Sequence, residues 1–112
     1  MLQALACVYP QAWMESLLGC PIHASAYGVV AKPIGLDLSA ALATFSVERA
    51  LQSAWLPVMD AVLRRAAEAA GEARPVPQLH LRGVIDMLAA YLGEERFCLA
   101  VHDDPDALAV LA

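Results

Sequence analysis

The sequence holds more large apolar side chains than one small core readily encloses. Apolar residue types make up 60% of its 112 residues, and 17 Leu, 4 Met and 2 Trp are among them. Soluble domains usually carry about 45–50% apolar residues even with glycine included. Apolar groups that a small domain leaves at its surface tend to gather at an interface. The excess therefore predicts a surface that contacts another protein chain. The 23 alanines leave open a densely packed monomer as the alternative, because alanine needs little burial.

The charge balance excludes several classes of partner. Twelve acidic against seven basic residues give a net charge of −5. Arg64, Arg65 and Arg74 lie close together, but the other bases are dispersed, so no basic stripe can neutralise a run of phosphates. Nucleic acids and anionic membrane surfaces are therefore not expected as partners. Six arginines against one lysine, with much alanine, are typical of a bacterial gene of high GC content.

Sorting signals and membrane spans are also not expected. No basic residue precedes Lys32, which argues against a secretory signal. No stretch of 18 residues is free of polar residues and turn formers, so we expect no transmembrane helix. Cys7, Cys20 and Cys98 are odd in number and widely spaced, which does not make a disulfide framework. These observations together predict a cytoplasmic protein.

Proline, glycine and the apolar periodicity divide the first two-thirds of the chain. A helix is expected from Pro10 to Leu18, closed by Gly19, and a strand within 22–30, where β-branched and aromatic residues gather. A long helical region is expected over 39–70, begun by Ser39 or Ser46 as N-cap and ended by Gly71. Pro57 should kink or break it, because proline removes a backbone donor.

The last third should contain a linker at 72–77 and a helix over 78–92 that ends at Gly93. Phe97, Leu99 and Val101 alternate, which predicts a strand over 96–102. A short helix should follow, opened by Asp104-Pro105-Asp106. The expected fold is a single α+β domain over 1–112, dominated by helices, with two or three short strands. An all-α bundle is the alternative.

A metal site is the sharpest chemical hypothesis. Cys20-x-x-His23 and Cys98-x-x-x-His102 supply the thiols and imidazoles that zinc favours. In a strand, however, the Cα atoms of Cys98 and His102 would lie about 13 Å apart, too far to share a zinc ion. The acidic cluster near the C-terminal end is explained by helix capping. No metal or other cofactor is therefore expected.

No motif for catalysis is present either. Nucleophilic catalysis needs a nucleophile, a base and an orienting group, and no local signature of such a set occurs. Cys20 follows a predicted helix end, where the helix dipole opposes a thiolate. Glycine-rich phosphate loops are missing as well. The sequence does not predict an enzyme.

Two clusters of large apolar residues are the candidates for a partner interface, because tryptophan and methionine are enriched at interface centres. The alternative is that both clusters are core. If they form an interface, Trp13→Ala or Trp55→Ala should weaken association and leave the monomer folded. The candidates are Trp13, Met14, Leu17, Leu18, Trp55, Leu56 and Met59.

The function that these observations favour is non-enzymatic protein–protein interaction. Such a protein would regulate a partner by covering its apolar surface, as an antiactivator of a transcription factor, an inhibitor or a chaperone does. The alternative is a small homodimeric enzyme or ligand-binding domain with a pocket near its dimer interface. The expected partner is thus another protein or a second copy of this chain.

Overall fold

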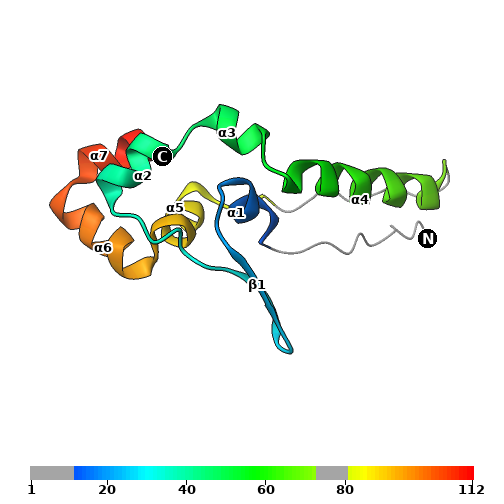
Figure 1. Ribbon diagram of the computed structural model, residues 1–112, viewed down its shortest axis with the longest axis horizontal. Coiled ribbons are helices and arrows are strands. Elements are labelled where there is room, and N and C mark those ends of the chain that lie inside the picture. The colour runs from blue at the N-terminus through cyan, green and yellow to red at the C-terminus, as the bar shows by residue number, and fades with distance from the viewer. Residues whose placement is uncertain (1–11, 73–80) are drawn as a thin grey trace.

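The computed structural model describes residues 12–72 and 81–112. Within these ranges the chain forms seven helices and one two-stranded antiparallel sheet (Figure 1), which confirms the helix-dominated α+β class. The molecule is elongated, with principal extents of 52 × 27 × 27 Å and a radius of gyration of 16.6 Å. A compact domain of this length would have a radius of gyration of about 13 Å. No helix within the described residues is both long and apolar enough to cross a membrane.

The first elements are a short helix and a hairpin. Helix α1 (Trp13–Leu17) is followed by Gly19 at φ +87°, which confirms the expected glycine stop. Strands β1 (Ile22–Ser25) and β2 (Gly28–Ala31) pair with Ile22 opposite Ala31. The strand expected within 22–30 is therefore a hairpin, and it projects away from the helices (Figure 1).

The long helical region expected over 39–70 is three separate helices. These are α2 (Leu38–Thr44), α3 (Val47–Leu51) and α4 (Trp55–Ala70). Asp37 caps α2, because its side chain accepts a hydrogen bond of 2.8 Å from the Ala40 N–H, so the expectation for Ser39 was wrong. Ser46 caps α3 as expected, and accepts from the Arg49 N–H at 3.1 Å.

Pro57 does not break the helix that contains it. It is the third residue of α4, and the interruption lies just upstream, at residues 52–54. The first turn of a helix tolerates proline because its N–H groups have no intrahelical partner. The proline thus marks where the helix starts. Gly71, at φ +60°, ends α4 as expected.

The C-terminal elements correct one strand prediction. Helix α5 (Val84–Leu92) begins after Gly83 and ends at Gly93, and residues 78–80 lie outside the described residues. The segment predicted as a strand, 96–102, belongs to helix α6 (Glu94–Asp103). Its alternating apolar residues misled the prediction, because Leu99 and Val101 are exposed. Helix α7 (Pro105–Leu111) follows with Asp104 as its N-cap, as expected.

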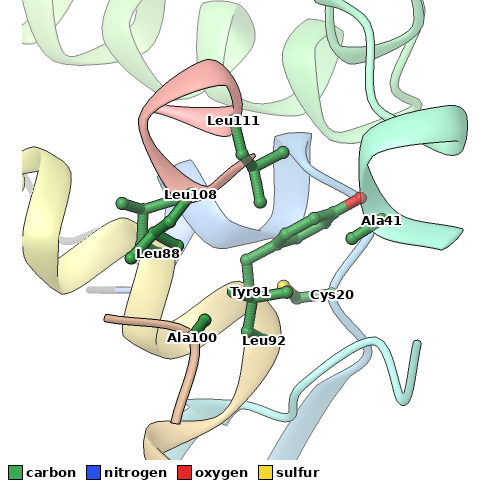
Figure 2. Close-up of a cluster of buried hydrophobic side chains, with 8 residues drawn as sticks. All are labelled: Cys20, Ala41, Leu88, Tyr91, Leu92, Ala100, Leu108 and Leu111. Carbon is green, nitrogen blue, oxygen red and sulfur yellow. The ribbon is translucent and has the colours of Figure 1, made fainter. Parts of the chain in front are cut away.

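Helices α2, α5, α6 and α7 pack together away from the far end of α4 (Figure 1). Figure 2 shows the buried side chains of this core. The ring of Tyr91 lies at its centre, and Phe45 packs edge-on against it with ring centroids 6.2 Å apart. Helix α4 extends away from this end, and its main helix contact is with α1 (Figure 1). The buried cluster consists of Cys20, Ala41, Leu88, Tyr91, Leu92, Ala100, Leu108 and Leu111.

Candidate protein-binding surfaces

Two adjoining cavities of 340 and 210 Å³ lie beside the core residue Tyr91, and we call them together the central groove. They share Leu18, Phe45 and Tyr91 as lining residues, so they meet beside α1 and α5. The first continues toward α3 at Arg49, and the second toward the start of α5 at Arg82. The groove is mainly apolar between these two arginines.

The first predicted interface cluster contributes to this groove. Met14, Leu17 and Leu18 all line it and are partly buried, as is Trp13 at the start of α1. Met87 of α5 adds a second methionine to the wall. Methionine adapts its flexible side chain to a bound surface, which suits a groove that receives a partner.

The second predicted cluster is divided between surface and interior. Trp55 is 39% exposed and Leu56 is partly buried, whereas Met59 is 3% exposed. Met59 lies on the same face of α4 as Ala70, which is also buried. Trp55 is therefore the member of this cluster that is most open to a partner.

Trp55 belongs to a row of exposed apolar residues that sequence reasoning did not separate from the core. Val47, Leu51, Trp55 and Val58 follow one another at spacings of four, four and three residues along α3 and α4. Their exposed fractions are 59%, 63%, 39% and 47%. We call this row the α3–α4 stripe. Residues 52–54 interrupt the helices between Leu51 and Trp55, so only the packing shows that these four side chains are uncovered.

The start of α5 is a further apolar surface. Leu81, Val84 and Ile85 are 69%, 56% and 69% exposed, although their spacing suits one face of a helix. Val84 also lines the central groove. Only the later turns of α5 enter the core, at Leu88 and Tyr91.

A buried ion pair holds the segment before α5 against α1. Arg82 Nη1 lies 2.8 Å from Oε1 of Glu15, whose side chain is 2% exposed. The Arg82 N–H also donates to Met14 Sδ at 3.1 Å. Asp86 lies four residues after Arg82, but the Arg82 guanidinium reaches across to α1 instead. Oε2 of Glu15 is buried and has no hydrogen-bond partner.

The candidate metal ligands do not come together in a coordination site. Cys20 is buried, and His23, Cys98 and His102 are exposed. On helix α6, Cys98 and His102 are spaced i, i+4, so the distance argument that assumed a strand no longer applies. The described residues nevertheless contain no group of three or more His, Cys, Asp or Glu arranged to hold a metal ion.

The Cys20 thiol is poorly suited to nucleophilic chemistry. Burial, with a smaller contribution from the negative charge of Glu15, raises its pKa to about 11. The thiolate is the reactive form of cysteine, and it is scarce at neutral pH when the pKa is this high. Cys7 lies outside the described residues.

Comparison of the chain with models of protein families, with curated proteins and with solved structures gave no match.

Proposed function

We propose that this protein is a non-enzymatic interaction module that regulates a partner protein by covering an apolar surface of that partner. The apolar central groove carries the proposal. Large apolar side chains of the described residues are also exposed beside it, among them Val84 and Ile85 at the start of α5. Apolar groups that gather at the surface of a small domain are typical of an interface.

The central groove is the proposed binding site. Its floor of Leu18, Phe45 and Tyr91 is apolar, and two methionines lie along its wall. Grooves of this composition receive the apolar face of an amphipathic helix. Among the described charged side chains, Arg49 and Arg82 line the groove, one toward each end. Arg82 is already paired with Glu15, so Arg49 supplies the positive charge that a partner can meet. The partner segment that fits is therefore an amphipathic helix with an acidic residue near its Arg49 end.

Affinity capture with matched variants tests this proposal. The tagged full chain would be exposed to lysate of its own host, and bound proteins identified and quantified by mass spectrometry. Val84→Glu places a charge in the groove wall at a residue that is 56% exposed. Val110→Glu makes the same change on α7, at a residue that is 79% exposed and does not line the groove. Circular dichroism would establish that both variants are folded.

We expect one protein to be recovered near one-to-one by the wild type and by Val110→Glu, and to be lost with Val84→Glu. Arg49→Glu should weaken its recovery, because it reverses a charge at one end of the groove. Recovery that is equal with all variants would refute the groove as the site. If no stoichiometric partner is recovered by any of them, the proposed function is wrong.

A further inference from the structure

A further cavity of 450 Å³ lies where strand β2 meets α1 and α5, and we call it the hairpin cavity. Its volume is within the range of about 300–1,000 Å³ that is usual for sites that bind small molecules. Val29 and Val30 of β2 form one apolar wall, and Ala89 and Ala90 of α5 form another. Of the described residues, only Arg82 lines both this cavity and the central groove, so the two sites are separate.

The charged residues around the hairpin cavity are mainly acidic. Among the described lining residues, Glu15, Asp86 and Glu94 are acidic and Arg82 is basic, so three negative charges against one positive give −2. Asp86 and Glu94 are exposed, whereas the side chain of Glu15 is 2% exposed. A hollow lined by one sign of charge attracts ligands of the opposite sign. The hairpin cavity therefore favours a cation.

The buried carboxylate of Glu15 has one oxygen that lacks a donor. Its Oε1 pairs with Arg82 Nη1 at 2.8 Å, and its Oε2 is buried without a hydrogen-bond partner. A buried charged acceptor without a donor is destabilising, and almost all buried polar atoms in folded proteins have a partner. The terminal carboxylate of a glutamate rotates readily, so Oε2 can turn toward a donor that enters the cavity. A ligand with an N–H donor would supply the missing hydrogen bond.

The single free oxygen discriminates between kinds of cation. A guanidinium binds a carboxylate best as a fork that needs both oxygens, but Arg82 already holds Oε1. A primary ammonium is compact and can direct one N–H group at Oε2 alone. The valines and alanines of the apolar walls suit an aliphatic chain attached to that ammonium. These features together match an alkylamine in its protonated form.

We propose that the hairpin cavity binds a primary alkylammonium ion. The ammonium donates to Oε2 of Glu15, and the alkyl chain lies between β2 and α5. This site goes beyond the proposed regulatory function and does not depend on it. Alkylammonium groups occur in free amines and in the lysine side chains of other proteins, and the choice of ligands in the test distinguishes these two sources.

Isothermal titration calorimetry of the purified full chain tests the site with diaminobutane, butylamine, butanol and Nα-acetyl-lysine amide. We expect diaminobutane to bind at one site and more tightly than butylamine, because its two positive charges match the net charge of the cavity. Butanol should not bind, since it lacks the charge, and added salt should weaken the binding of the amines. Tighter binding of diaminobutane than of Nα-acetyl-lysine amide would support a free amine, and the reverse order would support a lysine side chain.

Variants of the acidic residues assign the binding to this cavity. Glu15→Gln should raise the dissociation constant of diaminobutane at least about 10-fold, because the hydrogen bond loses its charged acceptor. Glu94→Gln should raise it about 2–5-fold, since this carboxylate is exposed. Glu95→Gln is the matched control, because Glu95 is the exposed neighbour of Glu94 and does not line the cavity. Circular dichroism would establish which variants are folded.

The absence of saturable binding for every amine at up to about 10 mM would overturn the proposal. A folded Glu15→Gln variant that binds diaminobutane as tightly as the wild type does would also overturn it. If Glu15→Gln does not fold, the double variant Asp86→Asn with Glu94→Gln decides, and unchanged affinity in that variant would reject the site. The groove is tested separately, because Glu94→Gln should still capture the groove partner.

Discussion

Glu15 illustrates how one buried charge ties two distant parts of the chain together. Its carboxylate is almost fully enclosed, so it depends on Arg82, which lies 67 positions later and remains 41% exposed. A buried ion pair adds little to stability overall, but removal of one partner leaves the other charge uncompensated. The pair therefore specifies where the segment before α5 lies against α1.

Arg82→Ala should lower the free energy of unfolding by about 2–3 kcal/mol, because it leaves the buried Glu15 carboxylate without its ion-pair partner. Urea denaturation monitored by circular dichroism measures this loss. The double variant Glu15→Gln with Arg82→Ala should recover part of it, since no charge is then left without a partner. A double variant less stable than Arg82→Ala would contradict this account.

The Cys20 thiol makes stability depend on pH in the alkaline range. Its pKa in the folded protein is about 11, above the ordinary value of 9.0, mainly because the thiol is buried. The unfolded chain therefore releases this proton at lower pH than the folded chain does. The stabilising contribution is complete below about pH 9 and is lost as the pH rises toward about 11.

We expect the urea midpoint of the wild type to decrease as the pH rises from about 9 to about 11. In Cys20→Ala the decrease should be less steep. Some dependence should remain in the variant, because burial also raises the pKa of Tyr91 above its ordinary value. Equal slopes for the two proteins would show that Cys20 does not contribute.

At the scale of single elements, helix ends that are marked by capping residues could be predicted from the sequence. Elements whose assignment depends on which residues are buried could not. Gly71, Gly93 and Asp104 end or begin helices as the sequence indicates, because their conformations or side chains satisfy the terminal backbone groups locally. The prediction of a strand at 96–102 was wrong because the alternation of apolar residues was taken as a sign that they share a buried face. Only Phe97 of the three alternating residues packs against the core.

The positions of the charged residues in α6 nonetheless indicate a helix. Glu94 and Glu95 occupy its first turn and His102 its last, which is the arrangement that the helix dipole favours. These charges compete with a short apolar alternation that suits either structure. The division of the region 39–70 was missed for a related reason, since alanine-rich stretches favour helix throughout. The break before α3 lies at Ser46, whose side chain caps that helix, and the break before α4 lies just upstream of Pro57.

The N-caps give a prediction for individual helices. Ser46→Ala should lower the free energy of unfolding by about 1 kcal/mol, because the Arg49 N–H would lose its acceptor. Asp37→Ala should cost a similar amount at α2. Ser39→Ala is the matched control and should change stability by less than about 0.5 kcal/mol. Thermal or urea unfolding distinguishes the three, and a larger effect at Ser39 than at Asp37 would reject the cap assignment.

At the scale of the whole molecule, the candidate surfaces follow from a core that occupies one end. The apolar excess predicted that some large side chains would remain outside the core, but the sequence could not say which. Met59 and Val58 are neighbours on α4, yet one is 3% and the other 47% exposed. Met14, Leu17 and Leu18 were identified from composition and spacing, and they do line a groove. The α3–α4 stripe required the packing to be known.

The contrast between these two neighbours can be measured. Met59→Ala should lower the free energy of unfolding by about 2–4 kcal/mol, because it removes a buried side chain and leaves a cavity. Val58→Ala should cost less than about 1 kcal/mol, since that side chain is half exposed. Urea denaturation at low protein concentration keeps self-association out of the comparison. Similar losses for the two variants would mean that this face of α4 is assigned wrongly.

Among the described residues, helix α4 lies apart from the core and contacts mainly α1, which has a consequence for how the native state opens. Segments with few buried contacts detach at a lower free energy than the core, so their backbone amides exchange with solvent deuterium sooner. Amides of α4 should therefore exchange through local opening, and those at Leu88–Leu92 only when the whole domain unfolds. A partner that covers the exposed side chains of Trp55 and Val58 would slow exchange in α4 without changing the slowest amides. Exchange of the slowest amides thus measures global unfolding of the core, whereas protection of the α4 amides measures whether a partner covers that helix.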